Sequence, residues 1–498
     1  LRPFTAAAPV RIRLGIPQHG GRRPPTRTGP AVRKLGIGLL AVVAVVAAGV
    51  LTFGSVIQPN SVPEPTIGIT PVVTSAMTAA APTIVPPYVA PRDRLDTGLM
   101  TIYIDTQNQA AITADADTPG DFTMSASTAT PECRGLQKSA ATFNVRGNTT
   151  AELPKKPYTI HLGESQDLCG MGKNKKWTLL ANWNDRTLLR NAASFYLGRQ
   201  LDHLAFTPQT YPADVYVNSA YVGSYELVES INVDKQRVDI DELNQNQSGK
   251  NDTGVNLTGG YLLEWDYRKK ANHVFAVGDH GYVGLRDPDD EVDGTGVTAA
   301  QVTYITDYVN KAEQALYDGD TFLDPDKGWR HYIDADAAVD YYLAQEFTKT
   351  YDGAFYSSVY MYKTRDTAAG PGKLFLGPMW DYDESLGNGT TPEIFHSPEG
   401  WYLQGYDSGH DERQSSATWF DRLMEDPTFV EQVKQRWREV YPRLQTTPSF
   451  ITERAALIEK SAKANFALWD PRATDDPGPL PKGTTLAKQN TYLLDWVN

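Results

Sequence analysis

The sequence predicts an α+β protein in which a β-rich part precedes a mostly helical part. Residues 99–267 contain short runs in which apolar and polar residues alternate, together with one stretch of helical spacing. Residues 297–347, and the chain from 415 onward, repeat their apolar side chains at helical spacing instead. Between these helical stretches lies a short β segment, "SSVYMYK" followed by "KLFLGPMWDYD".

The N-terminal region predicts a membrane anchor. Residues 35–57 are apolar and uncharged, and this stretch is long enough to cross a bilayer as a helix. Arg33 and Lys34 precede it, which places the basic tail 1–34 in the cytoplasm. We therefore expect a single-pass protein of the bacterial cell membrane, with its C-terminal domain extracytoplasmic behind a Pro/Thr/Ala-rich linker at 58–96. The alternative is a cleaved signal peptide and a secreted protein.

Charge is unevenly distributed along the 498 residues. Residues 1–34 contain eight of the 47 Lys and Arg residues and no acid, which leaves 39 bases against all 60 Asp and Glu residues. A body this acidic argues against nucleic acid as a partner.

Two cysteines, Cys133 and Cys169, are the only ones in the sequence. Outside the cytoplasm such a pair tends to oxidise, so we expect a disulfide. It would stabilise the fold by about 2–4 kcal/mol. The alternative is two unrelated buried thiols.

Local patterns predict individual elements of the β-rich part. A strand is expected near 99–106, and a helix over 185–201 with Asp185 as its N-cap. The alternating pattern on both sides of Asn218-Ser219 predicts a hairpin with these two residues in the turn. The run "GGYLLEWDY" at 259–267 reads as one more strand.

Carboxylates at turns are the candidate functional groups, because the sequence has no Walker A loop, HExxH or GxSxG motif. Asp381 and Asp383 follow an apolar run, and in a strand both would point to one face, with Cα atoms roughly 6–7 Å apart. Two carboxylates that close would suit a divalent cation with phosphate, or the two acids of glycoside cleavage. An ordinary strand end that enters a polar loop is the other reading.

For three further residues, the sequence is consistent both with a catalytic or binding role and with an ordinary structural one. Asp352 lies in a Gly-containing turn and is either a turn former or a general base. Lys155 and Lys156 directly precede a strand, and they are either solvated or directed at a phosphate.

Six blocks of sequence, in order, resemble the CotH family, whose members are regarded as atypical protein kinases. They are "VRGNTTAELPKKPYTIHL", "KKWTLLANWNDRTLLRNAASFYLGRQL", "PADVYVNSAYVGSYELVESI", "GGYLLEWD", "DGAFYSSVYMYK" and "GPMWDYDESLGNG". The resemblance covers 97–445, with 446–498 as a C-terminal helical extension. It implies a divergent protein-kinase-like bilobal fold with a β-rich N-lobe and a mostly helical C-lobe.

The resemblance also implies roles for individual residues. Lys156, or else Lys155, would contact the nucleotide, and Glu229 would lie near the adenine. Asp352 would be the catalytic base that accepts the substrate hydroxyl proton.

The metal ligands implied by the resemblance are Asp381 and Asp383, for Mg²⁺ or Mn²⁺. Ser357 occupies the position at which ordinary kinases have a metal-binding Asn. No GxGxxG loop is present, and Arg146, with the two residues after it, would cover the phosphates instead.

The implied function is transfer of the ATP γ-phosphate to Ser or Thr of exported or surface proteins. Two alternatives stay open at this point. One is a non-catalytic cell-surface or spore-coat protein that retains the fold, and the other is a carbohydrate-active enzyme.

Overall fold

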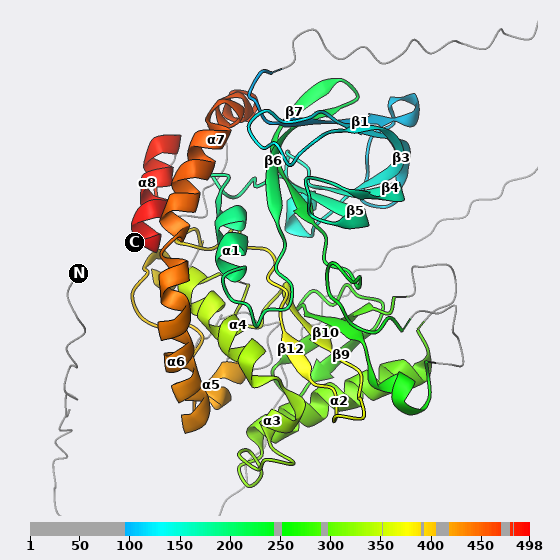
Figure 1. Cartoon of the computed structure of the whole chain (residues 1–498), viewed down its shortest axis with the longest axis vertical. Coiled ribbons are helices and arrows are strands. Elements are labelled where there is room, and N and C mark those ends of the chain that lie inside the picture. The colour runs from blue at the N-terminus through cyan, green and yellow to red at the C-terminus, as the bar shows by residue number, and fades with distance from the viewer. Residues whose placement is uncertain are drawn as a thin grey trace, which may run out of the picture. The chain divides into compact units, whose positions relative to one another are not determined.

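Seven strands at the N-terminal end of the described chain close into a barrel. The computed structural model describes residues 95–243, 251–289, 297–350, 352–389, 393–404, 418–469, 479–481 and 483–498, which all belong to one compact unit. The barrel strands are β1 (Met100–Thr106), β2 (Thr118–Met124), β3 (Leu136–Val145), β4 (Tyr158–Asp167), β5 (Lys173–Leu180), β6 (Thr210–Val217) and β7 (Ala220–Glu229). Their order is β1-β2-β3-β4-β5-β7-β6, and parallel pairing of β1 with β6 closes the barrel (Figure 1).

Alternating side chains fill the barrel interior. Phe122, Phe143 and Trp177 are fully buried there, as the period of two in their strands requires. The predicted hairpin is confirmed, since β6 and β7 pair antiparallel around Asn218-Ser219. Both turn residues have positive φ, 47° and 68°, which is the geometry of a type I′ turn.

A second sheet has five strands in the order β12-β11-β8-β10-β9. These strands are β8 (Tyr261–Trp265), β9 (Val274–Val277), β10 (Gly281–Asp287), β11 (Val359–Lys363) and β12 (Leu374–Leu376). The central strand β8 pairs with β10 on one side and with β11, about a hundred residues later, on the other. Every residue of β8 is buried, as expected for a central strand covered on both of its faces.

Helices pack around the second sheet and along one side of the barrel (Figure 1). They are α1 (Arg190–Gly198), α2 (Ala299–Tyr317), α3 (Trp329–Tyr332), α4 (Ala335–Thr348), α5 (Trp419–Leu423), α6 (Pro427–Leu444), α7 (Thr447–Leu468) and α8 (Leu486–Val497). Helix α7 lies against the barrel, where the Ser461 hydroxyl donates to Asp214 Oδ1 over 2.6 Å. The guanidinium of Arg454, on the same helix, donates to the Thr210 carbonyl over 2.7 Å.

The predicted kinase-like bilobal fold is wrong. The N-terminal strands form a closed seven-stranded barrel, and the part expected to be mostly helical contains a five-stranded sheet. Strand β8, which the sequence pattern grouped with the N-terminal strands, belongs to that second sheet. The error is one of pairing, because alternation predicts a strand but not its neighbours.

The predicted single-pass membrane localisation also needs correction. Within the described ranges, no helix is both long and apolar enough to cross a bilayer. Residues 35–57, on which that prediction rested, lie outside the described residues.

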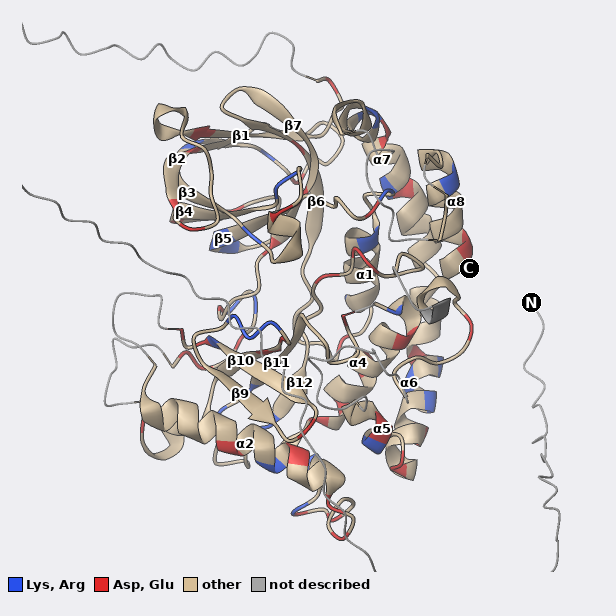
Figure 2. Ribbon diagram, turned by 180° about the vertical axis from the view of Figure 1, so that it is seen from behind, with Lys and Arg blue, Asp and Glu red and all other residues tan. Residues whose placement is uncertain are grey.

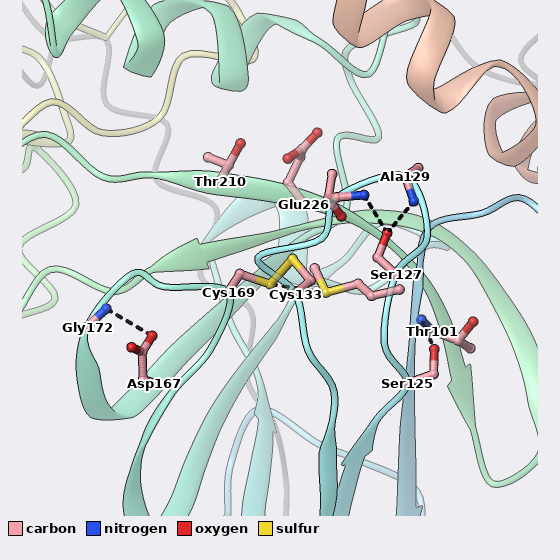
Figure 3. Close-up of a disulfide and its surroundings, with 12 residues drawn as sticks. Thr101, Ser125, Ser127, Ala129, Cys133, Asp167, Cys169, Gly172, Thr210 and Glu226 are labelled. Atoms are coloured by element: carbon pink, nitrogen blue, oxygen red, sulfur yellow. Dashed lines mark hydrogen bonds between the residues drawn. A yellow bond between two sulfur atoms is a disulfide. The ribbon is translucent and has the colours of Figure 1, made fainter.

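The predicted disulfide is confirmed between Cys133 and Cys169 (Figure 3). Each cysteine lies in a loop that a side chain stabilises. The Ser127 hydroxyl oxygen accepts from the Thr130 amide over 2.9 Å, and Asp167 accepts from the Gly172 amide over 3.1 Å. Both sulfurs are buried at the edge of the barrel core, so the bond ties the chain before β3 to the turn between β4 and β5.

Replacing both cysteines, Cys133→Ser with Cys169→Ser, should lower the free energy of unfolding by about 2–4 kcal/mol, because the unfolded chain regains the freedom that the loop closure removes. Urea unfolding of the variant and of the parent chain measures the difference. The parent chain in reductant is the control and should match the variant. Equal midpoints with and without reductant would contradict the prediction.

Candidate functional site

A cavity of about 520 Å³ lies between the barrel and the second sheet. Its volume is in the range of small-ligand pockets. Strand β5 and the loop after β3 line one wall, and strand ends of the second sheet line another. The cavity is completed by Thr350, Asp352, Tyr356, Ser358, Trp380, Asp381, Asp383 and Glu384. Figure 2 shows acidic and basic segments of the chain meeting in this region.

Six carboxyl groups line this cavity, and they come from three places in the sequence. They are Glu264, Asp266, Asp352, Asp381, Asp383 and Glu384. The three acids singled out from the sequence are therefore brought together, although their segments are about thirty residues apart. Their roles stay predictions at this point.

The conformation around Asp381 differs from the expected strand end. Strand β12 ends at Leu376, and Asp381 has a φ of 67°, in the left-handed region. Its carboxylate accepts a hydrogen bond of 3.1 Å from the Ser358 hydroxyl. A left-handed non-glycine residue costs energy and persists only where its surroundings enforce it, which is common at functional sites.

Burial and the close approach of neighbouring acids raise the pKa of several of these carboxyl groups. Burial raises the pKa of Asp352 well above its ordinary value, and the charges of Asp381 and Glu384 raise it further. The pKa of Asp383 is raised well above its ordinary value by the same causes. Burial and the Asp381 charge raise the pKa of Glu384 to about 7, against a weaker opposing effect of a hydrogen bond from Asn184. Such a cluster favours a bound cation or proton.

Arginines face these acids. The Arg146 guanidinium lies 5.0 Å from the centre of the Trp380 ring, and burial lowers its pKa while the nearby Asp381 charge opposes that shift. Arg286 pairs with Glu264, with 3.2 Å between Nε and Oε2. Arg146 thus supplies positive charge to the cavity while it stacks on an aromatic ring, an arrangement that arginine adopts readily.

The lysines and the glutamate predicted to contact the nucleotide lie elsewhere. Lys155 is buried and donates to the Ala181 carbonyl over 2.7 Å and to the Ser224 carbonyl. Lys156 donates to the Ala151 carbonyl over 2.8 Å. Glu229 pairs with Arg237 over 2.7 Å. Among the described residues that line the cavity, none of these three predicted residues is present.

Ser357 lies behind the cavity wall. Its hydroxyl accepts from Arg268 Nη1 over 2.7 Å and donates to Asp266 Oδ1 over 3.2 Å. The adjacent Ser358, not Ser357, lines the cavity and bonds Asp381. Ser357 therefore contacts two cavity residues without facing the cavity itself.

Several cavity residues were missed from the sequence, namely Glu264, Asp266, Arg268, Arg286 and Glu384. For two of these residues, the sequence contained a pattern that points to them. Glu264 and Asp266 stand two apart at the end of an apolar run, the same pattern that drew attention to Asp381 and Asp383. Only the pairing of β8 with β11 brings the two acidic pairs to one cavity.

The donor set suits a hard divalent cation by its chemistry, since carboxylate oxygens are the ligands such ions prefer. Within the described part of the chain, no group of three or more His, Cys, Asp or Glu side chains is arranged to hold a metal ion. Mg²⁺ in nucleotide enzymes is usually bound by one or two carboxylates, completed by phosphate oxygens and water. Two carboxylates of this cavity would therefore be enough.

Without a divalent cation, stability should fall as the pH rises from about 4.5 to about 7. The pKa of Glu384 is raised from 4.5 to about 7 by folding, so the folded chain binds more protons than the unfolded chain in this window. Urea unfolding in EDTA at about pH 5 and about pH 8 measures the fall. Glu384→Gln should reduce it, and a fall of unchanged size in that variant would contradict the assignment.

Comparison with known proteins places these residues in a family. No match was found among curated proteins. Residues 143–498, most of the chain, match the family described as CotH kinase protein, and the match includes all six acids of the cavity and Arg146. The resemblance inferred from the six sequence blocks is thereby confirmed, and the chain belongs to the CotH kinase protein family.

Proposed function

We propose that the chain is a protein kinase that transfers the γ-phosphoryl group of ATP to a Ser or Thr hydroxyl of a protein substrate in this cavity. Family membership supports kinase activity in general. The observation that carries the specific proposal is the meeting of Asp352, Asp381 and Asp383 with Arg146 in one cavity. Phosphoryl transfer depends on this combination, because catalysis consists mainly of positioning and of stabilising negative charge.

Asp381 and Asp383 are the proposed ligands of Mg²⁺ or Mn²⁺. When bound, the ion would neutralise charge on the ATP phosphates. The raised pKa of Asp383 supports this role, since burial and neighbouring acids make its ionised form costly until a cation compensates it. The bond from Ser358 holds the Asp381 carboxylate in a defined direction.

Asp352 is the proposed general base. It follows α4 and lines the same cavity as the metal-binding pair. Its raised pKa brings the carboxylate closer to the operating pH, where a base is most effective in accepting a hydroxyl proton.

Arg146 is the proposed phosphate-binding residue. It directly follows β3, and the next residue, Gly147, has a φ of 93°. Residues 147–150 also line the cavity, so backbone amides of this loop are close enough to the cavity to contact phosphate. The nucleotide roles predicted for Lys155, Lys156 and Glu229 remain predictions that the positions of these residues do not support.

Asp352→Asn should lower phosphoryl transfer by about 10²–10⁴-fold, because the amide cannot accept the hydroxyl proton. Asp381→Asn should also abolish most transfer, through loss of the metal. The assay incubates the purified chain and a Ser/Thr-containing protein acceptor with labelled ATP and Mn²⁺. Asp336→Asn is the matched control, since Asp336 is an exposed acid in the first turn of α4. Phosphoryl transfer that persists in both cavity variants would contradict the proposal. Nucleotide binding by the parent chain without any transfer would favour a non-catalytic surface or coat protein.

Arg146→Met should weaken ATP binding at least tenfold, because it removes a cation that faces the phosphates in the proposed arrangement. Lys156→Met is the companion variant, and we expect it to leave ATP affinity within about twofold, since its ammonium group bonds a backbone carbonyl outside the cavity. Fluorescence titration with ATP measures both. A larger loss of ATP affinity in Lys156→Met than in Arg146→Met would indicate that Lys156, and not Arg146, contacts the nucleotide.

A further inference from the structure

The segment that carries Asp383 is fastened to the start of helix α1 at both of its ends. At one end, Asn191 Oδ1 accepts a hydrogen bond of 2.8 Å from the Tyr382 amide. At the other, Arg190 Nε donates to the Ser385 carbonyl over 3.0 Å. Two consecutive helix residues therefore hold the backbone on either side of Asp383.

Backbone strain shows why such fastening is needed. Asp381 and Leu386, which bracket the segment, have φ angles of 67° and 47°, both left-handed without being glycine. Each such residue costs on the order of 1–3 kcal/mol unless the surroundings compensate it. Within the described residues, the Asp383 carboxylate accepts no hydrogen bond, so its position depends on the backbone that carries it.

The two helix residues are themselves held rigidly. Arg190 is 1% exposed and pairs with the fully buried Asp185, with 2.7 Å between Nη1 and Oδ1. The Asp185 carboxylate also accepts from the amides of Leu189 and Arg190 over 2.9 and 2.7 Å, which holds the start of the helix. The prediction of Asp185 as the N-cap is wrong, because α1 starts at Arg190 and Leu189 is its N-cap. Asn191 donates to Asn182 Oδ1 over 3.1 Å.

A second set of bonds joins the same two parts of the chain. Asn388 Nδ2 donates to the carbonyl of Asp383 over 2.7 Å and to that of Asn184 over 3.0 Å. Asn184 Nδ2 in turn donates to Glu384 Oε1 over 3.1 Å. Segments about two hundred residues apart are thus tied together by two asparagine side chains, one of which bonds the cavity acid Glu384.

We infer that Arg190 and Asn191 are positioning residues that hold Asp383 in its metal-binding place. The inference rests on the proposed role of Asp383 as a ligand of Mg²⁺ or Mn²⁺. Groups that orient metal ligands in this way typically change metal affinity by 10- to 100-fold when they are removed. Arg190 is not among the described residues that line the cavity. Asn191 does line it, but its side-chain oxygen and nitrogen are engaged by Tyr382 and Asn182, so the effect should be selective for the metal.

The experiment compares Mn²⁺ binding with nucleotide binding in the full chain. Asn191→Ala should weaken Mn²⁺ binding by about 10- to 100-fold, measured by electron paramagnetic resonance of the free ion. ATP affinity in EDTA should stay close to that of the parent chain, whereas the unfolding temperature should fall, because the buried Tyr382 amide loses its partner. Tyr196→Phe is the matched control, because Tyr196 is on the same helix but bonds Thr446 and stacks on Phe450 instead.

Arg190→Lys is the second variant, used with the same criteria if Asn191→Ala does not fold. It keeps a cation beside Asp185 but lacks the planar fork that also reaches the Ser385 carbonyl. Unchanged Mn²⁺ affinity in the folded variant overturns the inference. So does a parallel loss of Mn²⁺ affinity and ATP affinity in the folded variant, which would mean a purely structural role.

Asp383→Asn separates this inference from the proposed function. If Asp383→Asn and Asn191→Ala both weaken Mn²⁺ binding while the parent chain transfers no phosphoryl group, the positioning role stands and the kinase proposal fails. If Asp383→Asn leaves Mn²⁺ affinity unchanged, Asp383 is not a ligand and the positioning role is overturned, even where transfer is observed.

Discussion

Carboxyl groups that repel one another inside a buried cavity are the constraint that shapes this structure. Asp352, Asp383 and Glu384 all have raised pKa values because burial and neighbouring acids disfavour their charged forms. Left alone, such groups would move apart or draw in water. The chain instead holds them through side-chain bonds from α1 and through a backbone bond of 2.7 Å from the Leu386 amide to the Thr348 carbonyl at the end of α4. The energetic cost of keeping these buried carboxyl groups together is explained most simply if a cation binds among them during function.

The cavity exists because two independent sheets face each other. The closed barrel presents the loop after β3, with Arg146, and the second sheet presents the ends of β8 and β10 with their acids and arginines. Each sheet has its own apolar core, one inside the barrel and one beneath the second sheet. Polar residues collect between these cores, where the two sheets cannot interdigitate.

The C-terminal helices complete the support from behind. Leu386, directly after the acidic segment, packs with Ile451 of α7 and with Leu493 and Trp496 of α8. Tyr492 of α8 donates to the Gly387 carbonyl over 3.2 Å. A helix at the end of the chain therefore contacts the segment that carries the proposed metal ligands, so the site and the last helices form one structural unit.

Much of the local structure could be read from the sequence by itself. Alternation located several strands, although not β2, β9 or β10. Asn218-Ser219 marked the hairpin turn, and two cysteines in the whole chain left one possible disulfide. The pair Asp381 and Asp383, with Asp352, was also recognisable, since acids beside an apolar run are conspicuous. These features depend on neighbours within a few residues, which is the range over which a sequence pattern acts.

The tertiary structure decided which strands pair and toward which side individual side chains face. Closure of the barrel by β1 with β6, and the place of β8 beside β11, join segments about a hundred residues apart, and nothing in a strand's own alternation names its neighbour. The same holds for Lys155 and Arg146. Both are cations close to β3 and β4, but one turns to backbone carbonyls of the barrel while the other faces the acids, because the final packing alone determines which side of the chain borders the cavity.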